Sequence, residues 1–421
     1  MVLKIDRIGR LAGLAAMALL AACAATADLG KRHQPSQLAS PLPTGDFDAY
    51  VLAARQYIAA ANQMADAPLT AAVVEDRGPF ELAPRGPGCS TAGPDAKAAL
   101  LIHDLGDTPY VMRDLGERLA RACYLVRAVL LPGHGGVPGD LLTVNYRDWQ
   151  DAVRLGVDGL SGAAGEVTLV GFGVGGTLAL DYALSRKPGD EVDIAALVLL
   201  APAIPTPVSG FEAQTQRIYR ALAPLGSGGE WPQVFADSDP VRYESLPTNA
   251  GRQMNGLTLE LATQEQALDL PVFMAISADD VTVDADAARR WFCSRLAGRR
   301  QLIWYTSDPG GGLPCDFVEV RVSGPSDEVL DLSHIGLPVD PDNPLYGRTS
   351  GYRSCLHYYW EVATPSWFYC SDPAKTADNF DIRYGEISHS NLSEHVVRRL
   401  TYNPDFDDLV ADMMGFLDGA G

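Results

Sequence analysis

Short apolar runs alternate with amphipathic segments through the middle of the chain. Apolar runs of strand length, bounded by turn residues, lie at residues 97–102, 124–131, 167–170, 195–200, 271–277 and 301–305. Segments with helical periodicity follow most of them, at about 109–122, 148–160 and 284–296 and after the glycines of 171–176. Continuous apolar strands that alternate with helices are typical of parallel sheets buried on both faces. The pattern predicts an α/β fold with a mostly parallel central sheet covered by helices.

Three segments interrupt this alternation. Residues 204–268 carry amphipathic helical segments and a turn-rich run, and we expect them to form a helical cap between two core strands. Insertions are expected at about 307–327 and 338–380, on either side of a short apolar strand at 329–332. The tail, residues 403–417, is helical in pattern. Residues 96–421 are therefore predicted to be one domain.

The N-terminus has the pattern of a leader followed by an extension. Lys4, Arg7 and Arg10 precede the apolar run 11–22 and then Cys23, which is typical of a signal peptide over residues 1–22. The run before Cys23 resembles a bacterial lipobox, which implies a lipidated cysteine and an exported, membrane-anchored protein of the cell envelope. A non-lipidated signal peptide or an uncleaved anchor is the alternative. Residues 23–95 are expected to form a tether and a helical extension, the helix at 46–65.

The remaining cysteines are even in number. Removing Cys23 from the seven leaves six, and an even number in an exported chain suggests disulfides, although spacing does not give their pairing. Short loops close at the least entropic cost, which favours pairs such as Cys355 with Cys370. Buried free thiols are the alternative. The six are Cys89, Cys123, Cys293, Cys315, Cys355 and Cys370.

The net charge of the chain and the spacing of its histidines limit which partners and cofactors we expect. The formal net charge of −20 disfavours nucleic acid, which needs basic surface, and fits a small neutral or cationic molecule better. The histidines show no tight ligand spacing, so neither a metal nor another cofactor is expected. No oligomeric state is predicted. The seven histidines are at positions 33, 103, 134, 334, 357, 389 and 395.

The chain is organised around a glycine-dense hinge. The apolar run 167–170 leads into Gly171, Phe172, Gly173, Val174, Gly175 and Gly176, and an apolar, helix-like segment follows. This predicts a strand, a sharp turn and a helix. These glycines do not imply a phosphate-binding loop, because a sharp turn between a strand and a helix also explains their spacing.

The motifs around this hinge resemble those of the α/β-hydrolase superfamily, and in particular its branch of monoacylglycerol lipases, lysophospholipases and serine-aminopeptidase-like hydrolases. Five landmarks occur in that family's order, over residues 97–203 and 270–337. The hinge matches the G-x-S-x-G elbow, in which a strained turn exposes a serine. The five are the strand that ends in His103-Asp104-Leu105-Gly106, then Pro132-Gly133-His134-Gly135, the hinge, an acid after a late strand, and a late histidine.

The resemblance assigns an acid and a base. Asp280 is the expected acid because the aliphatic Val283 stands three residues after it, and a carboxylate there would orient an imidazole. His334 is the expected proton acceptor and donor. Asp279 could replace Asp280, and His389 competes with His334. A helix cap and an ordinary loop histidine are the alternative interpretations of the two assigned residues.

The resemblance also assigns an oxyanion hole to the backbone N–H groups of Leu105 and Val174. The family usually has glycine where this chain has Asp104. A carboxylate at this place is expected to repel a developing negative charge, which disfavours ordinary ester hydrolysis. His103 and His134 are expected to brace loops.

Gly173 is the decisive departure, because it stands where the serine nucleophile is expected and has no side chain that could form an acyl-enzyme. Thr177, one helical turn onward, is expected to point into packing. Three explanations remain: a non-catalytic binding protein, direct activation of water by His334 and Asp280, or a replaced serine. We therefore expect a family hydrolase of carboxylic ester or related acyl small molecules, with an inactive binding protein as the alternative.

Overall fold

The computed structural model describes residues 29–419, except 87, 91–92, 94, 187–191, 205–229, 309, 311–314, 325, 327, 362–364, 373 and 376–379. The expected signal peptide and Cys23 lie outside the described residues. So does the greater part of the first half of the expected cap, of which the structure describes residues 204 and 230–268.

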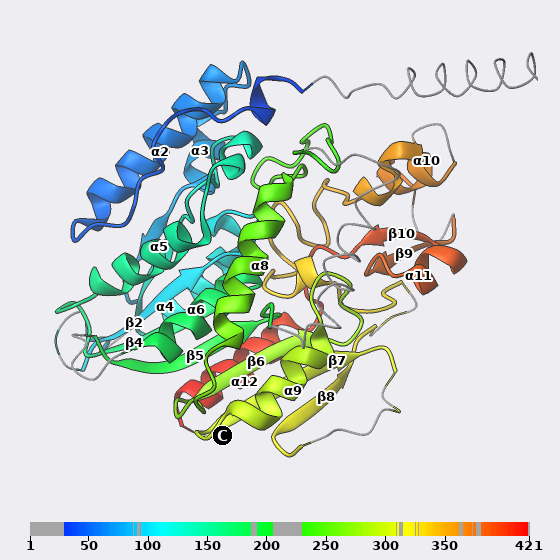
Figure 1. The fold of residues 1–421 in the computed structure, drawn as a ribbon. Helices are drawn as coiled ribbons and strands as arrows, with labels where there is room; N and C mark the ends of the chain where they lie inside the picture. Colours follow the sequence, from blue (N-terminus) through cyan, green and yellow to red (C-terminus); the bar gives the residue numbers. More distant parts are fainter. Residues whose placement is uncertain are drawn as a thin grey trace, which may run out of the picture.

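An eight-stranded sheet forms the centre of the molecule (Figure 1). Its order is β1-β3-β2-β4-β5-β6-β7-β8, and only β1 pairs antiparallel. The expected parallel sheet is therefore confirmed. The strands are β1 (Phe80–Leu82), β2 (Lys97–Ile102), β3 (Tyr124–Val129), β4 (Glu166–Phe172), β5 (Ile194–Leu200), β6 (Val272–Ser277), β7 (Arg300–Thr306) and β8 (Val318–Val322).

Helices pack on opposite faces of this sheet. In β2, Leu100 and Leu101 are both fully buried and, as neighbours in a strand, point to opposite faces. Gly156 of α5 lies against Leu100, whereas Gly116 of α4 lies against Leu101. The principal helices are α4 (Arg113–Arg121), α5 (Tyr146–Asp158), α6 (Val174–Ser185), α8 (Thr248–Ala262), α9 (Ala285–Arg295) and α12 (Phe406–Leu417).

The hinge between β4 and α6 requires glycine for close backbone packing. A Cβ on Gly175 would lie 2.1 Å from the carbonyl oxygen of Ile102, and one on Gly171 would lie 2.3 Å from that of Gly175. Contacts this short exclude any side chain at either position. The glycines thus let α6 start directly against β2, and this brings the end of β2 beside the turn at residue 173.

The N-terminal part packs on the body through one helix face. Helix α2 (Phe47–Met64) begins at Asp46, whose side chain accepts a hydrogen bond from the Ala49 N–H. Its buried face contacts Leu130 beyond β3, whereas Leu52 and Met64 are 59% and 53% exposed. That face is formed by Phe47, Tyr50, Ala54, Tyr57, Ile58 and Ala61.

Residues 29–45 do not form a free tether. The Ser36 N–H donates to Asp140 Oδ1 at 2.7 Å, and the Gly133 N–H donates to Ser40 Oγ at 3.0 Å. Gly139 approaches the backbone of Gln34 so closely that a Cβ would lie 2.2 Å from the Gln34 carbonyl oxygen. The sequence expectation failed because small and proline residues also suit an extended strap held by backbone contacts.

Three expected boundaries need correction. Residues 80–82, assigned to the N-terminal extension, form β1 and pair with β3, and residues 318–322, assigned to the insertion 307–327, form the edge strand β8. Both strands are short and polar-containing, as edge strands often are, so they lack the apolar run of a central strand. Residues 329–332 form only isolated bridges, from Val329 to Ser326 and Tyr384, rather than a strand.

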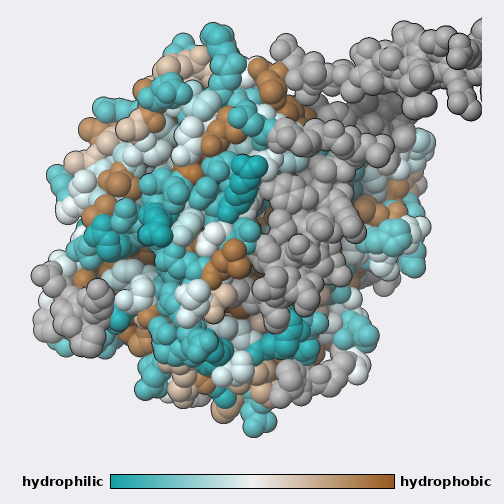
Figure 2. Space-filling view, viewed as in Figure 1, coloured by the Kyte–Doolittle hydropathy of each residue, from teal (hydrophilic) through white to brown (hydrophobic). Residues whose placement is uncertain are grey.

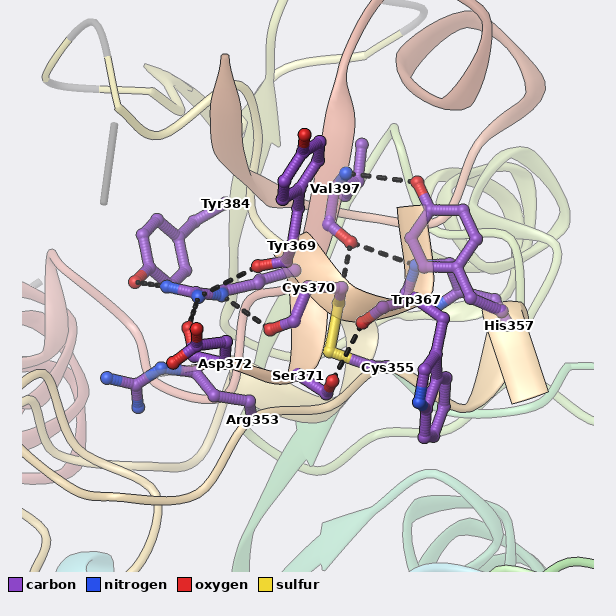
Figure 3. The surroundings of a disulfide bond; sticks show 12 residues. Arg353, Cys355, His357, Trp367, Tyr369, Cys370, Ser371, Asp372, Tyr384 and Val397 are labelled. Atoms are coloured by element: carbon purple, nitrogen blue, oxygen red, sulfur yellow. Dashed lines mark hydrogen bonds between the residues drawn. A yellow bond between two sulfur atoms is a disulfide. The ribbon is translucent and has the colours of Figure 1, made fainter. Parts of the chain in front are cut away.

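The six described cysteines form three disulfides, Cys89–Cys123, Cys293–Cys315 and Cys355–Cys370. The third lies within the expected insertion 338–380, and short elements continue beyond that range, so we use the name C-terminal insertion for residues 338–399. Its elements are η5 (Leu356–Glu361), α10 (Pro365–Ser371), β9 (Ile382–Gly385), α11 (His389–Glu394) and β10 (Val396–Arg399). Beside it the buried Arg398 donates to the carbonyl oxygens of Tyr369, Cys370 and Asp372, residues that Figure 3 shows around the disulfide. Arg398 thus ties β10 to the end of α10 and the segment after it, beside this disulfide.

The surface is mixed in character. On the face shown in Figure 2, hydrophobic residues are scattered among polar ones. Among the described residues, no helix combines the length and apolar character needed to cross a bilayer.

Candidate active site

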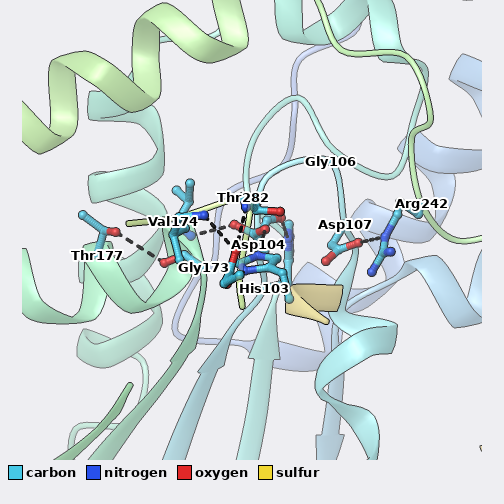
Figure 4. Close-up of polar contacts among 12 residues, drawn as sticks. His103, Asp104, Gly106, Asp107, Gly173, Val174, Thr177, Arg242 and Thr282 are labelled. Carbon is cyan, nitrogen blue, oxygen red and sulfur yellow. Dashed lines mark hydrogen bonds and ion pairs between the residues drawn. The ribbon is translucent and has the colours of Figure 1, made fainter. Parts of the chain in front are cut away.

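The sequence-predicted site residues meet at the carboxyl ends of the parallel strands. Asp104 follows β2, Gly173 follows β4 and Asp280 follows β6, while His334 opens the short helix η4 (His334–Gly336). Strands β2 and β4 are neighbours in the sheet, so the Asp104 loop and the Gly173 turn lie side by side (Figure 4). The carboxyl ends of the parallel strands therefore bring together residues that lie far apart in the sequence.

Asp280 and His334 are in direct contact. Asp280 Oδ2 lies 2.6 Å from His334 Nδ1, and Asp280 Oδ1 accepts the N–H groups of Thr282 and Val283 at 2.6 and 2.9 Å. Both side chains are almost fully buried. This carboxylate is therefore held by its own turn and fixes the ring of His334.

The competing residues lie elsewhere. Asp279 accepts hydrogen bonds from the backbone and the hydroxyl of Ser307. His389 opens α11 and is exposed.

Gly173 has the backbone of a strained elbow. Its φ of 54° and ψ of −119° suit glycine, and its N–H donates to the Leu200 carbonyl at 2.9 Å. A Cβ at this position would lie 2.0 Å from Asp104 Oδ1 and 2.1 Å from Asp104 Cγ. The carboxylate of Asp104 thus occupies the space in which a serine side chain would stand. A serine does not fit this site unless Asp104 moves.

The Asp104 carboxylate makes one contact expected of the missing serine, to His334, and one expected of a substrate oxyanion, to Val174. Asp104 Oδ1 accepts the Val174 N–H, a predicted oxyanion donor, at 2.6 Å. Asp104 Oδ2 lies 3.1 Å from His334 Nε2, the nitrogen expected to face a nucleophile. Figure 4 shows Asp104 pointing toward Gly173 and Val174. These donors stabilise the charge of Asp104, and the expectation that this carboxylate disfavours ordinary ester hydrolysis stays a prediction.

The charges in this cluster are strongly coupled. Burial alone would lower the pKa of His334, but the carboxylates of Asp280 and Asp104 outweigh it and raise that pKa to about 10. Burial would raise the pKa of Asp104, but His334 and the backbone N–H groups of Val174 and Leu105 reverse this and hold it below its ordinary value. At neutral pH the cluster is an imidazolium between two carboxylates.

Two histidines brace the loops beneath the site, as expected. His103 Nε2 accepts the Leu131 N–H at 3.0 Å, and His134 Nε2 accepts the Gly106 N–H at 3.0 Å. Burial lowers their pKa values to about 3 and about 4, so both are neutral acceptors. They hold the Asp104 loop against the loop after β3.

Thr177 does not face the site. Its buried hydroxyl donates to the Ala203 carbonyl at 2.9 Å, so it holds α6 to the end of β5. It is therefore no substitute for the missing serine.

A second layer behind His334 was not found from the sequence. The His334 N–H donates to Glu386 Oε2 at 3.0 Å, and Arg399 Nε lies 2.8 Å from Glu386 Oε1. Arg399 also donates to Thr282 Oγ1 at 2.8 Å, beside the turn that holds Asp280. Glu386 is completely buried. Both residues come from the C-terminal insertion, and no local motif marks them.

Another buried ion pair fixes the other end of the Asp104 loop. Asp107 pairs with Arg242, and Figure 4 shows this pair on the opposite side of the loop from Gly173. Arg242 stacks over the ring of Tyr346, whose hydroxyl donates to Asp239 at 2.8 Å. The loop is thus fastened to residues 230–268 of the expected cap and to the C-terminal insertion.

We expect that Gly173→Ser alone does not react with a fluorophosphonate probe, whereas the double variant Asp104→Gly/Gly173→Ser does. The Asp104 carboxylate fills the space that the serine side chain needs. It also contacts His334 Nε2, which would otherwise accept the serine proton. Labelling with mass spectrometric location of the adduct checks this, with Asp104→Gly alone as the matched control. Labelling of the single Gly173→Ser variant would contradict the geometry.

The charge state of His334 gives a second prediction. Both ring nitrogens should carry protons at about pH 8, and in Asp104→Asn the ring should titrate at a lower pH because one of two raising carboxylates is lost. The folded-state pKa lies above the unfolded value of 6.5, so this contribution to stability is complete below that value and is lost as the pH rises through about 10. Nitrogen NMR of the imidazole measures the titration. A neutral ring at about pH 8 in the unaltered protein would contradict the assignment.

Comparisons with known proteins agree with the fold. A family model described as serine aminopeptidase, S33, matches residues 93–307. The chain is 28% identical over 185 residues to a thermostable monoacylglycerol lipase from Bacillus sp. (strain H-257), covering 44% of this chain and 70% of that protein.

Solved structures of lipolytic enzymes are also similar. A structure from a study of the metagenome-derived enzymes LipS and LipT aligns with a TM-score of 0.40 at 20% identity, over 52% of this chain and 87% of the other. A soluble variant of the monoglyceride lipase from Saccharomyces cerevisiae, in complex with a substrate analogue, aligns with a TM-score of 0.40 at 15% identity, over 54% and 82%. With about half of its length matched by the family model, the chain belongs to the S33 serine aminopeptidase family of α/β-hydrolases.

Proposed function

We propose that this protein is a small-molecule hydrolase in which the carboxylate of Asp104 takes the place of the serine nucleophile as the group that faces the substrate. The observation that carries the proposal is the position of that carboxylate, on the space of the absent serine side chain and between Val174 N–H and His334 Nε2. The name of the relative from Bacillus, a monoacylglycerol lipase, supports a neutral acyl or ester-like molecule as one candidate substrate.

The charge state of the site decides where a reaction begins. An imidazolium with a pKa of about 10 has no free electron pair at neutral pH, so His334 does not deprotonate water in this resting state. The direct activation of water by His334 and Asp280 is therefore disfavoured. Asp104 is the only basic group of the cluster with some exposure, since its side chain is 14% exposed while those of Asp280 and His334 are 0% and 1%. A reaction at this site starts on Asp104.

A second candidate is a non-catalytic binding protein. The observation that favours it is that Asp104 itself engages the Val174 donor and His334, so a bound molecule finds both already occupied. In this case the pocket would recognise a ligand without transforming it.

The test is a substrate panel with matched variants. Purified protein is assayed on neutral esters, lactones, amides and epoxides, beside Asp104→Asn, His334→Gln and the control Asp279→Asn. We expect turnover of at least one class, with losses of about a hundred-fold or more in the first two variants, as for removal of a general acid–base or nucleophilic group. The control should retain activity because the Asp279 carboxylate faces Ser307. Saturable binding without turnover would favour the binding protein instead.

We also propose that Cys23 carries a lipid and anchors the protein to the cell envelope, after removal of residues 1–22. The basic residues, the apolar run and the lipobox-like segment before the cysteine support it. Growth of a bacterial host with an alkyne fatty acid should label the full-length chain, and Cys23→Ala should abolish the label. An unlabelled chain in the membrane fraction would point to the uncleaved anchor.

A further inference from the structure

We infer that a cleft at the end of the sheet opposite the Asp104 cluster binds a monoanionic amphiphile, a molecule with one carboxylate or phosphodiester group and an apolar chain. The cleft has a volume of about 520 Å³ and lies between the first residues of β7 and β8 and the end of α12. Strands β7 and β8 are parallel to the other central strands, so this cleft at their amino ends is separate from the site at the carboxyl ends. The inference is independent of the chemistry proposed for Asp104.

Two neighbouring arginines supply the positive charge of this cleft. Arg299 and Arg300 both line it, and Arg299 Nη1 and Arg300 Nε are buried with no hydrogen-bond partner among the described residues. Neither arginine pairs with a carboxylate in the part of the chain that the structure describes, whereas the nearby Arg321 pairs with Glu319. The chain has 53 acidic residues against 33 lysines and arginines, so cations without an acidic partner stand out. Buried donors are nearly always paired, and these two therefore indicate an acceptor from outside the chain.

The arrangement of the two guanidinium groups favours an anion at their edges. Arg299 Cζ lies 4.3 Å from the centre of the Phe416 ring, and Arg300 Cζ lies 5.1 Å from that of the Phe317 ring. Arg300 Nη1 also donates to the Leu296 carbonyl. Stacking on a ring covers one face of a guanidinium and leaves its N–H groups, which lie at the edge, free to donate. Such edges match the paired oxygens of a carboxylate or a phosphate group.

The other charges near the cleft favour a ligand with a single negative charge. Glu319 also lines the cleft, and Arg321, which donates to it at 2.9 Å, binds Asp405 and Asp412 as well. One cation thus serves three carboxylates beside the two free arginines, and a doubly charged phosphate ester would be repelled by the excess. The net charge of −20 acts at longer range and is screened over about 8 Å at physiological ionic strength, so the contacts with the two arginines decide binding.

Phe317 provides the apolar part of the cleft. The residue is 59% exposed, and its φ of 70° is a backbone conformation that a bulky residue rarely adopts. Two residues earlier, Cys315 is bonded to Cys293 of α9, so a disulfide holds this segment against the body. An apolar chain that lies along Phe317 and Val318 removes their surface from water, which strengthens binding by about two- to four-fold for each CH₂ group buried. An inorganic anion gains nothing from this surface, and the ligand is therefore amphiphilic.

Isothermal titration calorimetry of the purified protein with decanoate, below its critical micelle concentration, tests the inference. We expect one site, with binding weakened about ten-fold or more in Arg299→Gln and in Arg300→Gln, because each substitution removes a charge-assisted hydrogen bond. The matched control is Arg147→Gln, which removes the same charge from a side chain on α5 that is 71% exposed, and it should bind as the unaltered protein does. Octanoate, shorter by two CH₂ groups, should bind about four- to sixteen-fold more weakly.

A further variant separates loss of binding from loss of folding. Most of the Phe317 side chain is exposed, so Phe317→Ala opens no cavity in the core and should fold normally, as circular dichroism of every variant verifies. It should reduce the difference in affinity between decanoate and octanoate while the two arginines still bind the carboxylate. Decanol and decyltrimethylammonium, which have the chain without the negative charge, should bind about ten-fold or more weakly than decanoate.

A soluble lipid distinguishes the two sources of such a ligand. Tighter binding of dihexanoyl phosphatidylglycerol than of decanoate would support a lipid headgroup as the natural ligand, and weaker binding would support a free fatty acid. Unchanged decanoate binding in both arginine variants, or equal binding of decanol and decanoate, would overturn the inference. Neither result would affect the proposed hydrolase, whose test is turnover that depends on Asp104.

Discussion

A carboxylate buried beside a strained turn must find compensation for its charge, and this requirement organises the site. Desolvation of an ion costs several kcal/mol or more unless donors and an opposite charge surround it. Asp104 finds the Val174 N–H on one oxygen and His334 on the other, and its pKa falls below the ordinary value despite burial. His334 in turn needs Asp280, since one imidazolium then serves two carboxylates. Removing His334 leaves two buried carboxylates without their shared counter-charge.

The rest of the molecule holds this cluster in place. The close packing at Gly171 and Gly175 presses the turn against β2, and the neutral His103 and His134 hold the loop from below. Behind the ring, Glu386 and Arg399 connect the backbone of His334 to the turn of Asp280 through Thr282. These supports come from the sheet core and from the C-terminal insertion, so the insertion is part of the site's scaffold rather than a decoration of its rim.

The sequence predicted the central strands, the elbow and the pairing of Asp280 with His334 as neighbours, because apolar runs and motif order are local signals. Edge strands β1 and β8 were missed, since strands of three and five residues with one or two polar positions carry little periodicity. Glu386 and Arg399 were missed because their role arises from tertiary contact alone. Asp104 and Gly173 were both recognised as departures but read separately. Strands β2 and β4 are neighbours, so the residues that follow them lie close together. This signals that the two departures compensate, because Gly173 lacks the expected side chain while Asp104 carries one where the family has glycine.

That compensation also holds in charge. A serine, a neutral histidine and an aspartate would carry a net charge of −1, and two aspartates with an imidazolium carry the same net charge. The raised pKa of His334 indicates that it binds one more proton than in a serine site. The net charge that the core must bury is therefore the same with a carboxylate as with a hydroxyl. Compared with a serine site, this site thus holds one more proton, and one oxygen of its additional carboxylate lies against the Val174 N–H.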